Sequence, residues 1–331
     1  MQVLVTGGAG YIGSFMTKRL LREGYEVVVI DSLEKGHKEA IDEKATFVKG
    51  NILDKKFLDE LFKSYSFDAV FHFAAYISMG ESMEKPGMYF ENNVLGSVNV
   101  FDAMAKHNVK SLIFSSTAGV YGNPEVTPIP EDHPKRPTNP YGESKLFVEK
   151  ILQWYHTIHG INSVCLRYFN AAGAALDGSI GEAHAPETHI IPNIISAVLR
   201  NNPFSLFGTD YKTDDGTCVR DYIHVLDLAE SHILCLKGLR HKSGALHYNV
   251  GTGKGYSNKE VIDMVKKVTS SDIAIQKVEK RPGDAEVLIA NPDKIKRELG
   301  FIPKYSDLET IVITAWEWHR RNSKFKIQNS K

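Results

Sequence analysis

The chain lacks an excess of charge of either sign. Its 331 residues hold 40 Lys and Arg against 40 Asp and Glu, so the formal net charge is zero. Binding to nucleic acid or to an anionic membrane is usually driven by a basic excess, and none is present. No apolar run reaches the roughly 18 residues that a membrane-spanning helix needs. We therefore expect neither nucleic acid nor a membrane as a partner.

Cysteine is scarce, and the three that occur are Cys165, Cys218 and Cys235. Their odd number and wide spacing argue against a disulfide framework and are typical of reduced packing residues. The 13 histidines show no H-E-x-x-H or comparable spacing, so we expect no metal site. The first expected strand begins at residue 2, which leaves no room for a signal peptide. These features predict a cytoplasmic protein.

A glycine-rich turn follows the first expected strand. A buried strand at residues 2–6 and a helix at residues 12–23 flank Gly7, Gly10 and Gly13, whose spacing is G-x-x-G-x-x-G. A turn in this context presents backbone N–H groups and a helix N-terminus to a diphosphate. The pattern predicts a dinucleotide site.

Asp31 is the acidic residue that such a site needs for the adenosine ribose. It ends a second buried strand at residues 26–30, about 20 residues after the glycines. A carboxylate there accepts a hydrogen bond from the 2′-hydroxyl and repels a 2′-phosphate. The nearest cation is Lys35, and no arginine stands immediately beside Asp31. We therefore predict NAD rather than NADP.

Tyr141 and Lys145 stand four residues apart at the start of an expected helix. Asn139 is a good N-cap and Pro140 is favoured at the first helical position, so residues 141 and 145 share one face. A neighbouring positive charge favours the phenolate and lowers the pKa of a tyrosine from its usual value of about 10. The pair is predicted to transfer a proton to and from a hydroxyl group.

Strands and helices alternate through the first half of the chain, which implies a parallel sheet covered by helices on both faces. After Asn170 the sequence changes, and residues 171–188 are rich in Gly, Ala, Pro and Asp. We predict a Rossmann-type doubly wound α/β domain at residues 1–170 and a smaller α/β substrate domain at residues 171–331. Residues of about 220–250 are expected to return to the first domain, and the substrate is expected in the cleft between the two.

Further motifs are spread along nearly the whole chain. They lie at residues 5–14, 72–75, 80–82, 92–94, 115–122, 139–145, 166–170, 215–225 and 281–284. Together they resemble the extended short-chain dehydrogenase/reductase family, and within it the epimerases of UDP-sugars. The early motifs are shared by many nucleotide-sugar enzymes, whereas residues 215–225 point most specifically to the epimerases.

The resemblance implies NAD as cofactor and gives three residues a catalytic role. Tyr141 would exchange a proton with the sugar 4-hydroxyl, and Thr117 would lie in the hydrogen-bond path between them. Lys145 would hold the nicotinamide ribose and lower the tyrosine pKa. The other implied cofactor contacts are Gly7, Gly10, Tyr11, Ile12, Gly13, Asp31, Ser32, Asn51, Ile52, Phe73, Ala74, Ala75, Asn92, Ser115 and Phe169. Asn51 stands where the family usually has Asp, and Ile77 stands where some members have a lysine for the cofactor phosphates.

The resemblance also implies a second group of residues that bind UDP. Two phosphates need cations, and Arg220 and Arg281 are forked donors suited to them. Phe207 and Tyr222 suit the hydrophobic core as well as the base, and Arg220 could instead pair with Asp221. The implied substrate contacts are Thr117, Tyr141, Asn170, His189, Ile190, Phe207, Arg220, Tyr222, Arg281, Asp284 and Leu288.

The implied activity is NAD-dependent, reversible C4 epimerisation of UDP-galactose and UDP-glucose through a 4-keto intermediate. A 4,6-dehydratase would need an Asp-Glu pair after the catalytic threonine, whereas Ala118 and Gly119 follow Thr117. A non-catalytic NAD-binding protein would have lost part of the Tyr141, Lys145 and Thr117 set. The sugar stays open between hexose, N-acetylhexosamine and pentose. Leu288 matches the position that gates the sugar 2-substituent, and leucine is intermediate between a small residue and tyrosine.

The helices expected at residues 93–107 and 143–159 carry apolar residues on more than one face. A helix of this kind has more apolar surface than one core can cover. We therefore expect a homodimer packed through these helices.

Overall fold

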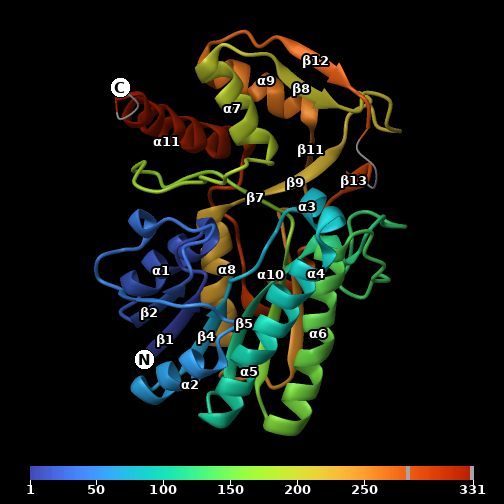
Figure 1. Cartoon of the computed structure of the whole chain (residues 1–331). Helices are drawn as coiled ribbons and strands as arrows, with labels where there is room; N and C mark the ends of the chain where they lie inside the picture. The colour runs from blue at the N-terminus through green and yellow to red at the C-terminus, as the bar shows by residue number, and fades with distance from the viewer. Residues whose placement is uncertain (281–283, 329–331) are drawn as a thin grey trace.

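The computed structural model of the chain describes residues 1–280 and 284–328. Seven parallel strands form the central sheet in the order β10-β6-β5-β4-β1-β2-β3 (Figure 1). Their bounds are β1 Gln2–Thr6, β2 Glu26–Asp31, β3 Thr46–Lys49, β4 Ala69–His72, β5 Ser111–Thr117, β6 Asn162–Tyr168 and β10 Ala245–Val250. The strand order reverses between β1 and β4, which is where doubly wound sheets bind dinucleotides. The predicted Rossmann-type α/β fold is confirmed.

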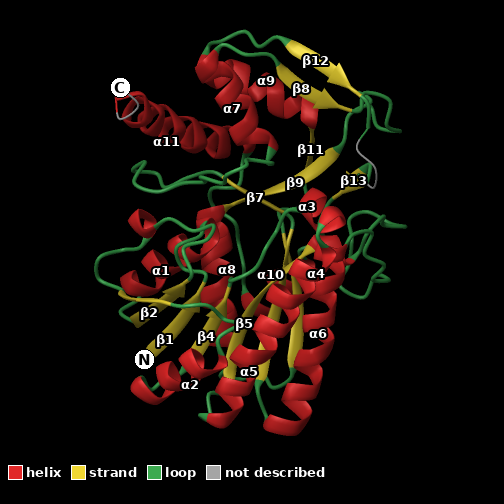
Figure 2. Cartoon of the chain, viewed as in Figure 1, coloured by secondary structure: helices red, strands yellow, loops and turns green. Residues whose placement is uncertain are grey.

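Helices cover both faces of this sheet, as Figure 2 shows. One apolar core contains residues of α1 and α8, and a second contains residues of α2, α5 and α6. The bounds are α1 Tyr11–Arg22, α2 Lys55–Ser64, α5 Gly96–Lys106, α6 Pro140–His159, α8 Val225–Gly238 and, beside β10, α10 Asp293–Leu299. Both faces of the sheet are therefore buried, which explains why its strands are continuous runs of Val, Ile and Phe.

The two smaller sheets lie in the upper part of the molecule in Figure 1, together with further helices. Strands β7 Asn170–Ala172, β9 Val219–His224, β11 Gly255–Ser257 and β13 Val287–Leu288 form one sheet, and β8 Phe204–Phe207 pairs with β12 Ile275–Val278. Helices α7 Ile190–Arg200, α9 Asn258–Thr269 and α11 Leu308–Gln328 share a third apolar core. After β9 the chain passes through α8 to β10, which pairs with β6 in the central sheet.

Several short elements lie around the carboxyl ends of the central strands. They are α3 Met79–Glu84, α4 Pro86–Tyr89, the π-helix η2 Phe90–Leu95 and the 3-10 turns η1 Lys38–Ala40 and η3 Ala118–Val120. The helix expected at residues 93–107 is therefore η2 followed by α5. Within the described ranges, no helix is both long and apolar enough to cross a membrane. All three cysteines are buried and free.

Candidate active site

A cavity of about 1760 Å³ extends from the carboxyl ends of the central strands to the small sheet of β7, β9 and β13. Its lining includes every described residue that the sequence predicted for the site except Lys145. Lys145 lies behind the cavity wall and is 2% exposed. Arg281, the remaining predicted residue, lies outside the described residues. The structure thus brings the two predicted groups of residues to one cavity.

The glycine-rich turn forms one end of this cavity between β1 and α1. A Cβ atom at Gly7 would lie 2.6 Å from the Ala74 backbone nitrogen, and one at Gly13 would lie 2.2 Å from the Gly7 carbonyl oxygen. Gly7 also has φ +70°. Gly10 precedes the first turn of α1 and contributes no side chain to cap it, so the N–H groups of that turn stay available to a ligand. This backbone geometry fits a dinucleotide diphosphate.

Asp31 lies at the end of β2 beside the same turn. Its carboxylate accepts hydrogen bonds from the N–H groups of Ala9 at 3.0 Å and Leu33 at 2.8 Å. Burial raises the pKa of Asp31, and these two N–H groups act in the opposite direction. The carboxylate is therefore held in a fixed orientation at the cavity wall, where a ribose hydroxyl can donate to it.

Tyr141 and Thr117 meet across the cavity from α6 and the end of β5. The α6 helix begins as the sequence predicted, because Asn139 Oδ1 accepts a hydrogen bond from the Gly142 N–H at 2.9 Å. Burial raises the pKa of Tyr141, and a hydrogen bond with Thr117 lowers it only in part. The expectation that a neighbouring charge lowers this pKa is therefore wrong for the chain alone, since desolvation has the larger effect.

Lys145 lies one helical turn after Tyr141 on α6. Its Nζ donates a hydrogen bond to the Ser115 carbonyl at 2.8 Å and stands 4.9 Å from the centre of the Phe114 ring. Burial lowers the pKa of Lys145 to about 7. An ammonium so poorly hydrated gains much from any oxygen ligand that reaches it, which suits a group that binds a ribose hydroxyl.

Two supporting residues were missed by the sequence analysis as parts of the site. His72, at the end of β4, contacts Thr6 Oγ1 through Nδ1 at 2.6 Å and Ser97 Oγ through Nε2 at 2.8 Å. Asn93, in the π-helix, accepts from the Tyr76 N–H at 2.9 Å and donates to Ser144 Oγ at 3.1 Å. Both residues lie within motifs that the sequence analysis identified, at residues 72–75 and 92–94, but their contacts depend on the tertiary structure. They fix the backbone around the cavity.

The UDP end of the predicted site lies on the small sheet. Arg220 and Tyr222 both lie on β9, and Leu288 on β13 stands opposite Arg220 in the strand register. The predicted alternative, an Arg220–Asp221 pair, is not favoured, because neighbouring side chains of a strand point to opposite faces. The buried Asp221 instead accepts hydrogen bonds from Thr252, Gly253 and Ala290. Arg220 Nη1 contacts the Val219 carbonyl at 2.9 Å.

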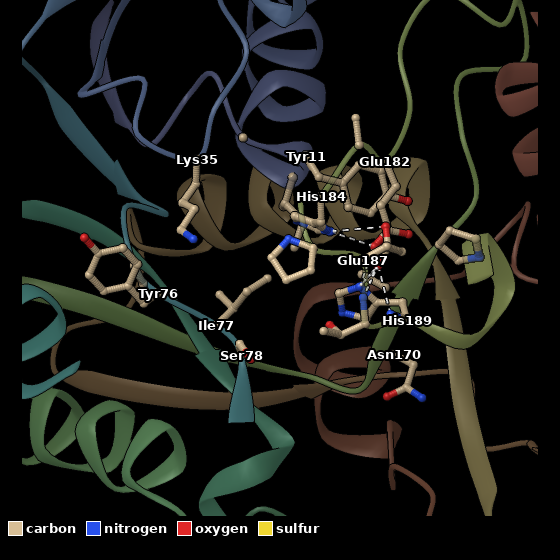
Figure 3. Close-up of a pocket in the computed structure, with 18 of the residues that line it drawn as sticks. Tyr11, Lys35, Tyr76, Ile77, Ser78, Asn170, Glu182, His184, Glu187 and His189 are labelled. Carbon is tan, nitrogen blue, oxygen red and sulfur yellow. Dashed lines mark hydrogen bonds and ion pairs between the residues drawn. The ribbon is translucent and has the colours of Figure 1, made fainter. Parts of the chain in front are cut away.

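Ile77 lines the cavity where the resemblance led us to expect a lysine in some relatives. The lining also includes Lys35, whose side chain extends into the cavity in Figure 3. The hydroxyl of Tyr76, next to Ile77, donates to Glu34 at 2.6 Å. Lys35 therefore supplies a positive charge on the side of the cavity where Ile77 replaces the lysine of some relatives.

Four side chains of the loop between β7 and α7 form a cluster that the sequence analysis did not find. They are Glu182, His184, Glu187 and His189, and Figure 3 shows them converging at the cavity wall. Although burial lowers it, Glu182 and Glu187 raise the pKa of His189 to about 10. The E-x-H-x-x-E-x-H spacing was the signal in the sequence, and its intervals of two, three and two residues keep to no single helical or strand period.

Comparison with known proteins gives consistent matches along the chain. The model of the NAD dependent epimerase/dehydratase family matches residues 3–251. The UDP-glucose 4-epimerase of Lactobacillus helveticus is 47% identical over 98% of this chain and 98% of that protein. The crystal structure of UDP-glucose 4-epimerase from Brucella ovis in complex with NAD is 44% identical with a TM-score of 0.92, covering 95% of this chain and 97% of that chain. The Bifidobacterium longum enzyme in complex with NAD⁺ and UDP is 36% identical with a TM-score of 0.93, covering 98% of this chain and 99% of that chain.

Proposed function

This chain belongs to the NAD dependent epimerase/dehydratase family, and from that premise we propose that it interconverts UDP-galactose and UDP-glucose by epimerisation at C4. The observation that carries the proposal is that Tyr141 and Thr117 line one cavity with the glycine turn and the UDP residues, with Lys145 directly behind its wall. A hydroxyl of the substrate can reach the phenol directly or through Thr117. The relatives named UDP-glucose 4-epimerase support the same activity. One of the solved structures holds NAD, and another holds NAD⁺ and UDP.

The proposed chemistry assigns one proton to the protein. The glycine turn, Asp31 and Lys145 would hold NAD, which would supply a hydride acceptor and donor for C4 of the sugar and a cationic ring that favours the phenolate. Tyr141 accepts the proton of the 4-hydroxyl and later returns it, and Thr117 holds the hydroxyl in line. Lys145 donates to the nicotinamide ribose. Because burial raises the pKa of Tyr141, the phenol keeps its proton in the chain alone. That proton would leave to solvent when the cofactor binds, before Tyr141 accepts the proton of the 4-hydroxyl.

Inversion requires that the sugar turns while the nucleotide stays in place. We assign the nucleotide to the small-sheet end of the cavity, where Arg220, Tyr222 and Asn170 lie together on β9 and β7. The forked guanidinium of Arg220 can hold the diphosphate. The Leu288 side chain offers apolar contacts only. This division holds UDP through polar groups and leaves the hexose loosely bound.

Other reactions on the same fold are less well supported. A 4,6-dehydratase needs an acid and a base beside the catalytic threonine, and Ala118 and Gly119 cannot transfer a proton. A non-catalytic NAD-binding protein has no need for the Tyr141–Thr117 contact. The sugar could still carry an N-acetyl group or be a pentose, since Leu288 is of intermediate size.

We also propose that the chain forms a homodimer in the cytoplasm. Phe147, Trp154 and Ile158 lie on one stripe of α6 and are 40%, 66% and 67% exposed. A second copy packed on this stripe would cover them. Light scattering at micromolar concentration should give a dimer for the wild type and for Gln153→Lys, and a monomer for Trp154→Lys. A monomeric wild type would contradict the dimer. The cytoplasmic location is supported by the three free cysteines, which suit a reducing compartment.

The test of the activity uses the purified chain with its bound nucleotide. UDP-galactose is added and UDP-glucose is measured by chromatography. We expect conversion to an equilibrium mixture from either substrate, and no conversion of free galactose. Absence of product from both UDP-sugars, in protein shown to contain NAD, would contradict the proposal.

A further inference from the structure

The loop between β7 and α7 brings four potential metal ligands together at the cavity wall. One ligand atom from each of Glu182, His184, Glu187 and His189 lies within 4.8 Å of the others. His189 Nδ1 stands 2.6 Å from Glu182 Oε1 and 3.0 Å from Glu187 Oε1. His184 Nδ1 stands 3.0 Å from Glu182 Oε1 and 3.9 Å from Glu187 Oε2. These separations are those of groups arranged around a single point.

We propose that these four side chains bind one Zn²⁺ ion. Zinc takes His nitrogen and Glu oxygen at about 2.0–2.1 Å, and a regular tetrahedron of such bonds separates the ligand atoms by about 3.3 Å. The four separations between a His nitrogen and a Glu oxygen, with either oxygen of Glu187, run from 2.6 to 3.9 Å and surround that value. All four ligand atoms lie within 4.8 Å of one another, and rotation of the side chains would bring the wider pairs to the tetrahedral separation. Two imidazoles with two carboxylates are a zinc-type donor set, whereas Mg²⁺ and Ca²⁺ prefer oxygen ligands alone.

Burial and charge also favour a cation at this place. The Glu182 side chain is 5% exposed and that of Glu187 is 18% exposed, so two carboxylates meet in a poorly hydrated wall. Carboxylates that are buried together need a nearby positive charge, which a protonated imidazole or a bound cation can supply. With neutral imidazoles, two carboxylates and Zn²⁺ have no net charge. His189 is 43% exposed and the cluster lines the cavity, which gives the ion a path of entry.

Four protein ligands leave no open position, so the ion would be structural rather than catalytic. It would fasten the loop where Ile190 begins α7. The loop is already anchored elsewhere, for example where His37 Nε2 contacts the Ala183 carbonyl at 2.8 Å and where the Tyr11 hydroxyl donates to the Gly173 carbonyl at 2.6 Å. His184 also packs edge-on against Tyr11 of the glycine turn, with ring centres 6.3 Å apart. The ion would thus connect the cofactor end of the cavity to the start of α7. His189 would bind through Nδ1 and keep Nε2 for the substrate phosphates.

Metal content can be measured without any enzyme assay. Purified full-length chain is loaded with ZnCl₂, dialysed against metal-free buffer and analysed for zinc by mass spectrometry. Competition with a chromophoric chelator then gives the Kd. We expect one Zn²⁺ per chain for the wild type. His184→Ala and Glu187→Gln should weaken binding more than 100-fold, because even residues that only support metal ligands contribute about 10–100-fold. Two variants are tested so that at least one of them is folded, as judged by circular dichroism.

The control is His241→Ala, which removes an exposed imidazole outside the cavity and should leave the zinc content unchanged. Loading with Co²⁺ should give the intense visible bands of four-coordinate cobalt in the wild type and the control. Less than one tenth of an equivalent of zinc in the wild type would overturn the proposal. The four side chains would then only form ion pairs with one another. Equal zinc in wild type and His184→Ala would overturn it too.

One consequence rests on the proposed function. Removing zinc should raise KM for the UDP-sugar and leave kcat nearly unchanged, because the ion orders the loop before α7 and not the reacting atoms. Stoichiometric zinc without any epimerase activity would contradict the proposed function and not the metal site. Activity without zinc binding would contradict the metal site alone.

Discussion

The carboxylate of Asp31 accepts a hydrogen bond from the backbone N–H of Ala9 at 3.0 Å. The end of β2 and the glycine turn after β1 are therefore one unit, although they are separated in the sequence by α1. A second hydrogen bond, from Leu33, restrains the other oxygen at 2.8 Å. The side chain that is proposed to select the cofactor is thus positioned by the turn that is proposed to bind its diphosphate.

This relationship predicts the effect of Asp31→Asn on cofactor choice. The amide keeps the shape but loses the charge that strengthens a hydrogen bond to the ribose and repels a 2′-phosphate. Its NH2 group also cannot accept one of the two backbone hydrogen bonds. NAD should bind about 10–100-fold more weakly, since hydrogen bonds to charged groups contribute about 1.5–3 kcal/mol. NADP should lose less affinity. Calorimetric titration of nucleotide-free protein measures both, with Asp263→Asn on the exposed side of α9 as the control. Equal weakening of NAD and NADP would be evidence against the ribose contact.

The second prediction concerns Tyr141→Phe, which removes the proposed proton acceptor and leaves the ring. Turnover of UDP-galactose should fall about 10²–10⁴-fold, the usual contribution of a positioned acid–base group. Bound NAD, released by denaturation and quantified by its absorbance, should stay at the wild-type amount. Tyr65→Phe, a substitution just after α2 and outside the cavity, should change neither quantity. Turnover of Tyr141→Phe within twofold of the wild type would refute the role of the phenol.

Sequence reasoning predicted those elements whose signals are local. The start of α6 follows from Asn139 and Pro140, which act within one helical turn. Helix α8 was missed because nine of its residues are buried, and a helix that is apolar on most sides shows no 3.6-residue period. Strands of two or three residues, such as β13, are too short to show alternation. Their existence is decided by pairing with β9.

The site follows the same division. The spacing of Tyr141 and Lys145 is local and was recognised from the sequence. The direction of the Tyr141 pKa depends on burial, which spacing does not reveal. Arg167 and Glu149 form a buried pair at 2.7 Å, yet they come from β6 and α6, so only packing brings them together. The Glu182 cluster was missed because an irregular loop places its four side chains.

Buried histidines predict how stability depends on pH. Burial lowers the pKa of His72 to about 3 and the pKa values of His224, His232 and His247 to about 4. In the unfolded chain imidazoles bind protons near pH 6.5. Below pH 6.5 the unfolded state therefore holds more protons than the folded state. The free energy of unfolding should therefore decrease as the pH is lowered from about 6.5 to 5, by up to about 1.4 kcal/mol per pH unit for each histidine.

Urea unfolding at several pH values across this window tests the prediction. His232→Asn should be less stable at pH 7, because it loses buried contacts, but its stability should fall less steeply toward pH 5. His241→Ala replaces an exposed histidine and should keep the wild-type slope. A wild-type free energy of unfolding that is constant from pH 6.5 to 5 would contradict the four lowered pKa values.

The size of residue 288 should decide which sugar the chain accepts. Leu288 lines the cavity opposite Arg220, close to the proposed position of the diphosphate and hence of the sugar attached to it. Leu288→Ala opens space for a 2-acetamido group, and Leu288→Tyr fills it. The ratio of kcat/KM for UDP-N-acetylgalactosamine to that for UDP-galactose should rise about tenfold with alanine and fall by a similar factor with tyrosine, because small changes in pocket volume are worth about 1–3 kcal/mol. Val287→Ala is the control, since the Val287 side chain points to the face of β13 opposite that of Leu288. If both Leu288 variants keep the wild-type ratio, the gate lies elsewhere.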